Sequence, residues 1–308
     1  MRVIEGYDEL DAVSRVLAIG AFDGVHLGHQ TLIEHAKSLA VAAGVRLCVA
    51  TFDPLPLEVL RPEIPLRRLS GICRRLSLIG EQEPDEVLVI PFSRAFSTLT
   101  AEAFVDDVLA SAACAIQVVV GSDFRFGNRA SGDVELLRSR GAQRGIDVSA
   151  LDLIELDGEK ISSSRIRALI QNGDVSQAAA LLGRAPWLDG FVTRGFARGR
   201  ELGVPTANLA WPDGRVVPAA GVYAGYATLE PGSERYRAAI SVGRNPTFDD
   251  VQGTAVESYL IDFEGDCYGR PMRVDFVEHL RPELQFQSIA ELVTQIWTDV
   301  ERARLLPV

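Results

Sequence analysis

The 308-residue sequence has no long apolar run, and positive charges, histidines and cysteines are few. No stretch approaches the ~18–20 apolar residues that span a bilayer. The first fifteen residues carry acidic side chains where a signal peptide needs an apolar segment. These absences argue against a membrane protein and predict a cytoplasmic one.

Lysine and arginine number 31 against 42 aspartates and glutamates, so the formal net charge is −11. Proteins that bind nucleic acids neutralise phosphates with clustered basic side chains. The composition therefore predicts no nucleic-acid partner, and an anionic ligand must be held by a local site. No feature of the sequence indicates an oligomeric state.

The four cysteines are Cys48, Cys73, Cys114 and Cys267. They are too scattered for a C-x-x-C zinc or redox pair, and too few for a disulfide framework in a chain of this length. We expect reduced thiols, most of them in the core.

The length predicts two domains, and residues 1–184 are expected to form a Rossmann-like α/β domain. Apolar runs alternate here with helical stretches, which is typical of a parallel sheet covered on both faces. The expected strands are 16–22, 45–52, 86–92, 116–121 and 146–154, and the expected helices are 29–43, 70–80, 101–111 and 133–143. Two short helices divided by an Asn-Gly-Asp turn are expected within 161–183.

Residues 185–308 alternate polar and apolar side chains without helices between the expected strands, which is typical of a small antiparallel β-barrel. The expected strands are 190–195, 221–229, 235–243, 255–263 and 272–280. A helix over 288–304 should follow, because apolar residues recur there at helical spacing.

The decapeptide GAFDGVHLGH, residues 20–29, lies at the predicted turn from the first long strand into the first helix. Ligands of open α/β sheets bind at such turns, and a helix N-terminus attracts phosphate. The chain lacks both G-x-G-x-x-G and a P-loop lysine. His26 and His29 are therefore candidates to donate hydrogen bonds to a phosphoryl group, while the three glycines allow close backbone approach. The alternative is a pair of histidines packed in a loop.

Further characteristic stretches follow the decapeptide. They are TFDPLP (51–56), GSDFRFGNRASGD (121–133), ISSSRIRALIQNGDV (161–175), GRELGVPTANL (199–209), SVGRNPTF (241–248), VESYLIDFEGDCYGR (256–270) and LRPELQFQSIAELVTQIWTD (280–299). Together they resemble, in order and over essentially the whole chain, the bacterial bifunctional riboflavin kinase/FMN adenylyltransferase family, also called prokaryotic FAD synthetases.

The resemblance implies that the first domain is a nucleotidyltransferase, which joins FMN to the AMP part of ATP and releases pyrophosphate. His26 and His29 would contact the α-phosphate, and Arg165 the departing phosphates. Asp123 and Phe124 would hold the flavin. The other residues implied to bind the nucleotide are Gly20, Phe22, Asp23, Gly24, Gly28, Ser162, Ser163, Ser164 and Arg167.

The sequence departs from the family pattern at two places. Leu55 stands where the family usually has histidine, which removes a polar group near the first site. Arg74 or Arg75 stands where the family usually has lysine, so the charge is kept in a different geometry. These departures are compatible with a changed substrate specificity, for example for a flavin analogue.

The resemblance implies that the second domain is a riboflavin kinase, which moves the γ-phosphate of ATP onto the terminal ribityl hydroxyl. Thr206 and Asn208 would hold Mg²⁺ with hard oxygen ligands, and Glu257 would accept the hydroxyl proton. Arg281 would lie near the flavin. The nucleotide would be bound by Gly199, Arg200, Gly203 and Pro205, and Asn245 and Thr247 would shape the rim.

Three functions remain open at this point. The first is a bifunctional enzyme that uses riboflavin, FMN and ATP with Mg²⁺. The second is a riboflavin kinase, or an enzyme specific for a flavin analogue, with an altered first site. The third is a flavin-binding protein without turnover. Taken singly, Glu257 could be a carboxylate on a wet strand face, and Arg281 could form a surface ion pair.

Overall fold

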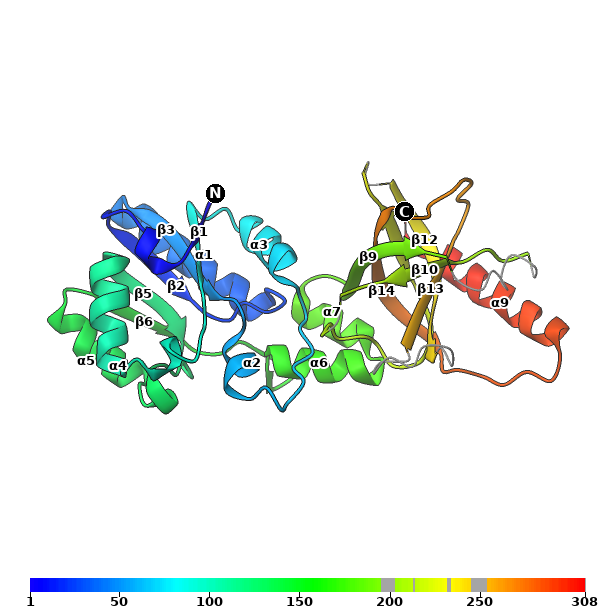
Figure 1. Ribbon diagram of the computed structural model, residues 1–308. Coiled ribbons are helices and arrows are strands. Elements are labelled where there is room, and N and C mark those ends of the chain that lie inside the picture. The colour runs from blue at the N-terminus through cyan, green and yellow to red at the C-terminus, as the bar shows by residue number, and fades with distance from the viewer. Residues whose placement is uncertain (195–202, 213, 232–233, 245–253, 308) are drawn as a thin grey trace. The chain divides into compact units, whose positions relative to one another are not determined.

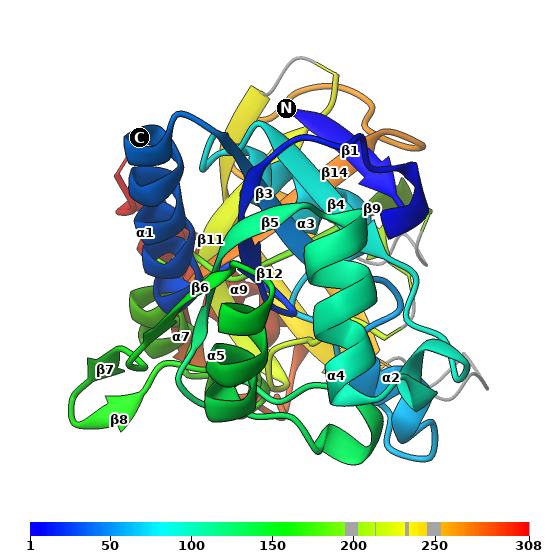
Figure 2. The same ribbon diagram turned by 90° about the vertical axis from the view of Figure 1, so that its left-hand side faces the viewer.

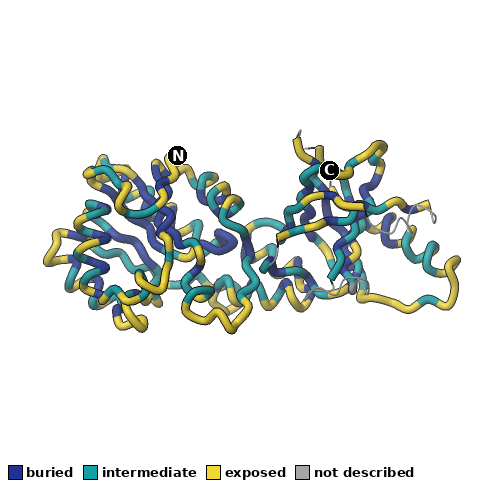
Figure 3. Tube along the Cα trace, viewed as in Figure 1, coloured by how far each residue is buried: buried dark blue, intermediate teal, exposed yellow. Residues whose placement is uncertain are grey.

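The computed structural model describes residues 1–194, 203–212, 214–231, 234–244 and 254–307 (Figure 1). The chain forms two compact units, Met1–Ser163 and Ser164–Val308. Each unit has its own hydrophobic core. Figure 3 shows these cores as buried segments along the strands of each unit.

The first unit contains a six-stranded parallel sheet in the order β1-β4-β3-β2-β5-β6. The strands are β1 (Arg2–Glu5), β2 (Arg15–Ile19), β3 (Arg46–Phe52), β4 (Glu86–Ile90), β5 (Ala115–Gly121) and β6 (Asp147–Leu151). The Rossmann-like prediction is confirmed. The sequence analysis missed β1, because four residues with a single buried side chain give too short a pattern.

Helices cover both faces of this sheet. The helices are α1 (Leu27–Ala43), α2 (Pro56–Leu60), α3 (Ile72–Gly80), α4 (Ala101–Ala103), which continues as the π-helix η3 (Phe104–Ala112), and α5 (Val134–Gln143). The connections through α1 and α3 run toward one edge of the sheet, and those through η3 and α5 run toward the other. Right-handed crossovers therefore place the two pairs on opposite faces. Figure 2 shows α1 on one side of the sheet and α4 with α5 on the other.

The connections that follow β2 and β5 run toward opposite edges of the sheet, and these two strands are neighbours. Open α/β sheets bind their ligands at the carboxyl ends of such neighbouring strands, because the connecting segments diverge there. The decapeptide 20–29 follows β2, and residues 122–124 follow β5. The fold thus brings two of the stretches singled out from the sequence to the same edge. The remaining small elements are the turns η1 (Tyr7–Glu9), η2 (Phe96–Thr98) and η4 (Asn128–Ala130), and the hairpin β7 (Glu155–Leu156) and β8 (Glu159–Lys160).

A buried ion pair joins two strands at the opposite, amino end of the sheet. Arg15 at the start of β2 has no exposed surface, and Glu86 at the start of β4 is 2% exposed. The Nε of Arg15 donates to Oε2 of Glu86 at 2.7 Å, and its Nη1 donates to the carbonyl oxygen of Ala113 at 3.2 Å. These contacts stabilise the unit far from the decapeptide.

We expect Glu86→Gln to lower the free energy of unfolding of the first unit by about 3 kcal/mol, because it leaves the buried charge of Arg15 without its main counter-charge. Urea unfolding of the full chain measures this. The control is Glu83→Gln, since Glu83 pairs with Lys37 at an exposed site and its loss should leave the transition unchanged. Equal effects of the two variants would contradict the prediction.

The second unit is a closed antiparallel barrel of six strands in the order β10-β13-β12-β11-β14-β9. The strands are β9 (Trp187–Thr193), β10 (Ala207–Ala210), β11 (Gly221–Leu229), β12 (Glu234–Arg244), β13 (Thr254–Leu260) and β14 (Pro271–Arg281). The barrel prediction is confirmed. Strand β10 was not predicted, because the whole stretch 199–209 has the character of a ligand loop.

Three helices accompany the barrel in the part of the unit that the structure describes. They are α6 (Ser163–Asn172), α7 (Val175–Leu182) and α9 (Ile289–Arg304). The hydroxyl of Ser176 on α7 donates to the carbonyl oxygen of Val277 on β14 at 3.0 Å. The predicted final helix is confirmed as α9, which begins after Ser288, whose side chain caps it. Val300 and Ala303 of α9 pack on the outer wall of the barrel.

The prediction that most cysteines lie in the core is wrong. Only Cys48 is buried, and burial raises the pKa of its thiol to about 12. Cys73 is exposed, while Cys114 and Cys267 are partly buried. All four are free, as expected from their spacing.

Candidate active sites

The decapeptide forms the turn between β2 and α1, and its two histidines lie against each other. The rings of His26 and His29 are stacked, with centroids 3.6 Å apart and planes 16° apart. His26 is the N-cap of α1, and its Nδ1 accepts a hydrogen bond from the backbone N–H of His29 at 3.3 Å. The pair therefore lies at the positive end of the helix dipole.

The cap bond determines which nitrogen of His26 can act as a donor. An Nδ1 that accepts a hydrogen bond carries no proton, so the neutral ring has its proton on Nε2. Gly28 leaves room for this ring, since a Cβ at that position would lie 3.3 Å from the Cε1 and Nδ1 of His26 and would press on it. Phe22 packs edge-to-face against the ring of His29, with ring centroids 5.1 Å apart. The turn thus fixes two imidazoles side by side.

Asp23, also singled out in the sequence, points into the protein. Its carboxylate accepts the backbone N–H groups of Leu69 at 3.0 Å and Ser70 at 2.9 Å, and it is 1% exposed. The backbone oxygen of Asp23 accepts the hydroxyl of Ser163 at 2.9 Å. Asp23 and Ser163 therefore hold the turn, and Phe22, which is also fully buried, shapes it from inside.

Ser162 and Ser163 belong to the first unit, and α6 begins at Ser163. Ser164, Arg165 and Arg167 follow on that helix, in the second unit. Ser164 is exposed, and the two arginines are half-buried. Their roles at the phosphates stay predictions.

A cavity of about 520 Å³ opens beside the loop that follows β5. Phe124 lines it, stacked on Phe126 with ring centroids 5.5 Å apart. Asp123 is exposed on the same loop and is not part of the lining. The other aromatic residues of the wall are Phe52, Phe92, Phe96 and Phe104. An apolar, aromatic cavity of this size suits a planar ring system.

Most of this aromatic wall was not predicted from the sequence. Phe52 ends β3 and Phe92 follows β4 closely, so an aromatic residue at the carboxyl end of each strand was an available signal. Because carboxyl ends of parallel strands meet at one edge, these rings had to lie near Phe124.

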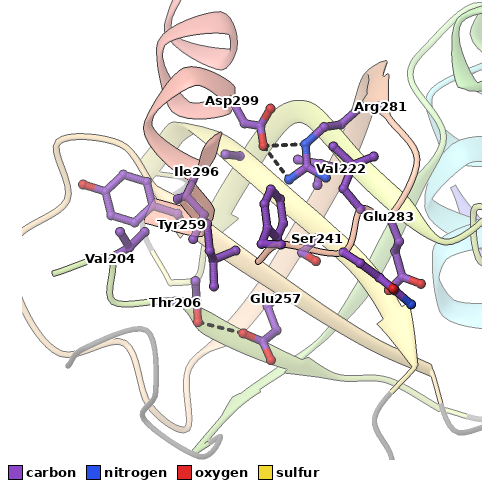
Figure 4. Close-up of a pocket in the computed structure, with 15 residues that line it drawn as sticks. Val204, Thr206, Val222, Ser241, Glu257, Tyr259, Arg281, Glu283, Ile296 and Asp299 are labelled. Atoms are coloured by element: carbon purple, nitrogen blue, oxygen red, sulfur yellow. Dashed lines mark hydrogen bonds and ion pairs between the residues drawn. The ribbon is translucent and has the colours of Figure 1, made fainter. Parts of the chain in front are cut away.

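The second unit has a pocket of about 630 Å³ on the outer wall of its barrel (Figure 4). Alternate residues of a strand face opposite sides, so every second side chain on four strands points to this wall. Those that line the pocket are Val222 of β11, Ala239 and Ser241 of β12, Glu257 and Tyr259 of β13, and Arg281 of β14. Val204, Thr206, residues 283–286, and Leu292, Ile296 and Asp299 of α9 complete it.

One end of this pocket is rich in oxygen atoms. The hydroxyl of Thr206 donates to Oε2 of Glu257 at 2.9 Å. Asn208 lies directly opposite Glu257 in the β10–β13 ladder, and Ser241 lies opposite it in the β12–β13 ladder. Because directly opposed residues share a face, the strand register collects these groups at one place.

The other end of the pocket contains an ion pair next to apolar side chains. Arg281 donates through Nε to Oδ2 of Asp299 at 2.9 Å, and Asp299 is 3% exposed. Gln295 donates to the second oxygen of Asp299 at 3.0 Å. Figure 4 shows the Arg281–Asp299 pair and the Thr206–Glu257 pair at opposite ends of the pocket. Arg281 thus forms an ion pair and lines the pocket at the same time.

Part of the predicted nucleotide loop lies outside the described residues, namely Gly199 and Arg200, and so do Asn245 and Thr247. Gly203 is exposed with a φ of 79°, a conformation that glycine adopts without strain. Pro205 is exposed next to Thr206.

Comparisons with known proteins match both halves of the chain. The family model for FAD synthetase matches residues 9–165, and the one for riboflavin kinase matches residues 182–306. A bifunctional riboflavin kinase/FMN adenylyltransferase from Pseudomonas fluorescens is 35% identical, covering 99% of this chain and 98% of the relative. One from Listeria monocytogenes is also 35% identical, covering 96% and 94%.

The chain belongs to the bifunctional riboflavin kinase/FMN adenylyltransferase family.

A crystal structure of a protein named macrolide-efflux protein, from Streptococcus pneumoniae, has a TM-score of 0.90 and 32% identity over the full length of both chains. That name differs from those of the curated relatives, and both family models agree with the relatives. In the part of our chain that the structure describes, no helix is long and apolar enough to cross a membrane.

The two departures from the family pattern lie below the surface of the first site. Leu55 is 3% exposed at the start of α2 and is not among the residues that line the aromatic cavity. Arg75 has no exposed surface, and its guanidinium contacts Ala21 and Asp53. Arg74 is half-buried. Of the two arginines, Arg75 is thus an internal cation.

Proposed function

We propose that the two reactions of the family are carried out at the two sites described above. The chain is an enzyme that phosphorylates riboflavin to FMN and adenylylates FMN to FAD, with ATP as co-substrate in both steps. The stacked histidine pair at the β2–β5 edge supports adenylyl transfer in the first unit. The Thr206–Glu257 pair on the barrel wall supports phosphorylation in the second.

In the first unit, a phosphate oxygen of FMN attacks the α-phosphorus of ATP, and pyrophosphate leaves. The enzyme chiefly positions the two phosphates and stabilises the charge of the transition state. The Nε2–H of His26 and the ring of His29 are the donors we assign to the α-phosphate, assisted by the N-terminus of α1. Arg165 is assigned to the departing pyrophosphate, and the aromatic cavity to the isoalloxazine ring.

In the second unit, Glu257 accepts the proton of the terminal ribityl hydroxyl as the hydroxyl oxygen attacks the γ-phosphorus of ATP and ADP leaves. The Thr206 hydroxyl holds the carboxylate through their 2.9 Å hydrogen bond. The apolar end of the pocket, with Tyr259 and Ile296, receives the flavin ring, and Arg281 stays near it. The pocket has a carboxylate at one end and apolar side chains at the other, which suits the ribityl chain and the ring of riboflavin respectively.

Kinases of this kind need a divalent cation, and the residues present fit Mg²⁺. Thr206 and Asn208 offer neutral hard oxygens beside a carboxylate, the donor set that Mg²⁺ takes when substrate phosphates complete its shell. Among the described residues, no group of three or more His, Cys, Asp and Glu side chains could hold a metal ion. The bound ion would neutralise charge on the ATP phosphates. Gly199, Arg200, Gly203 and Pro205 are assigned to the nucleotide.

One assay separates this proposal from its alternatives. Pure protein is incubated with ATP and Mg²⁺ and with either riboflavin or FMN, and the products are separated by chromatography. We expect FMN and FAD from riboflavin, and FAD from FMN. FMN without any FAD would support a kinase with an altered first site, and flavin binding without product would support a binding protein.

Phe124→Ala should raise the KM for FMN in FAD formation about 10-fold, because it removes one aromatic face from the cavity. Steady-state kinetics at saturating ATP measure this. The KM for ATP and the phosphorylation of riboflavin should change less than about 2-fold. An unchanged KM for FMN would place the flavin elsewhere.

The domain boundary after residue 184 is part of the proposal. The two family matches leave residues 166–181 between them, and the compact units divide after Ser163. Helices α6 and α7 fill this interval, and limited proteolysis with mass analysis of the fragments would place the boundary. We also propose a cytoplasmic location, where ATP is available to both sites.

A further inference from the structure

The turn that carries His26 has a strained backbone. Phe22 has a φ of 49° and Val25 a φ of 40°, although neither residue is a glycine. Both are fully buried. Side-chain-bearing residues remain in the left-handed region only where surrounding contacts over-determine the conformation, and such positions concentrate at functional sites.

One set of contacts holds the start of the turn. The carbonyl oxygen of Ala21 accepts hydrogen bonds from Oγ1 of Thr51 at 3.0 Å and from Nη1 of Arg75 at 3.1 Å. The other arm of Arg75, Nη2, donates to Oδ1 of Asp53 at 3.1 Å. Asp53 follows the end of β3, so the guanidinium links the turn to the neighbouring strand of the sheet.

A second set of contacts holds the middle of the turn. The hydroxyl of Ser70 accepts the backbone N–H of Gly24 at 3.0 Å. Ser70 also donates its own N–H to the carboxylate of Asp23 at 2.9 Å. Ser70 lies just before α3 and Arg75 lies in its first turns, so one short segment supports the turn at two points.

The burial of Arg75 indicates that its guanidinium has an internal role. The side chain is 0% exposed, so it has no surface from which to reach a substrate phosphate. A buried guanidinium is costly unless acceptors meet it. The planar fork suits two acceptors at fixed positions, which the compact ammonium group of lysine does not.

We propose that Arg75 is a positioning residue for adenylyl transfer. Its guanidinium ties the Ala21 carbonyl to Asp53 and so holds the strained turn with His26 and His29 directed at the reacting phosphate. This inference rests on the role proposed above for the two histidines. Loss of the fork displaces donors that act in the transition state, so it lowers kcat more than it weakens ATP binding.

The test compares Arg75→Met and Arg75→Lys with wild type in the full-length protein, at a temperature below the onset of unfolding of each variant. We expect Arg75→Met to lower kcat of FAD formation from FMN ~30-fold, with KM for ATP within about 3-fold. Arg75→Lys should recover part of the loss and remain ~5-fold below wild type, because an ammonium group reaches one acceptor at a time. Riboflavin phosphorylation in the same samples should change less than about 2-fold.

Arg15→Met is the matched control, because Arg15 is equally buried at the other end of β2. It should lower the unfolding temperature yet leave kcat per folded molecule within about 2-fold. If Arg75→Met behaves in the same way, Arg75 is only structural and the proposal is overturned. If Arg75→Met does not fold, Arg75→Lys decides, and a wild-type kcat for it overturns the proposal. If His29→Ala leaves FAD formation intact, the site assignment itself is wrong, whatever Arg75 does.

Discussion

Replacing His29 with alanine lowers the rate of FAD formation from FMN about 100-fold or more, the scale for removing one donor to a transition-state oxyanion. His29 is the better test of the pair, because His26 also caps α1 through its Nδ1 and its loss would disturb the helix. Initial rates with saturating FMN and ATP measure the effect.

Two comparisons make this result specific. Phosphorylation of riboflavin by the same variant should stay within a few-fold of wild type, because that site lies in the second unit. His35→Ala is the matched control, since His35 lies further along α1 and outside the turn. An equal loss of both activities in His29→Ala would reject separate sites, and an equal loss of FAD formation in His35→Ala would reject the special role of the stacked pair.

Replacing Glu257 with glutamine lowers riboflavin phosphorylation about 1000-fold, within the range for losing a general base. Glutamine keeps an oxygen that can accept the Thr206 hydroxyl, so the pocket retains its shape while it loses the proton acceptor. The rate of FMN formation from riboflavin, with ATP and Mg²⁺ saturating, measures this effect.

The matched control is Glu278→Gln. Glu278 lies on β14 and pairs with Arg302 at 2.9 Å, outside the residues that line the pocket. It should leave phosphorylation within about 2-fold of wild type. FAD formation from supplied FMN should be unchanged in both variants. A Glu257→Gln enzyme with near-normal phosphorylation would assign the base to another residue.

The placement of the first site could be predicted from residues close together in sequence. A strand, a glycine-containing turn and a helix follow one another within 15–43, so local spacing alone brings His26 and His29 to a helix N-terminus. The stacking of their rings and the use of Nδ1 as a cap follow from that local geometry. The aromatic cavity did not follow, because its rings come from segments after three different strands.

The second site shows the same division. Glu257 and Thr206 were singled out by resemblance to the family motifs, and they prove to be hydrogen-bonded across 51 positions. The pairing of Arg281 with Asp299 needed the position of α9 on the barrel wall, which an amphipathic pattern alone does not give. The strand β10 was missed for a related reason, since four residues become a strand only through pairing with β9 and β13.

The sequence by itself determined the class of each domain and, through resemblance to a known family, the order of the two activities and the candidate residues for their chemistry, because periodicity and short motifs depend on neighbours along the chain. Only the tertiary structure decided what supports those residues. Arg75 lies far from Ala21 in sequence and beneath it in the fold. The burial of Arg75 and its contacts with Ala21 and Asp53 depend on segments distant in sequence, so neither can be derived from local spacing.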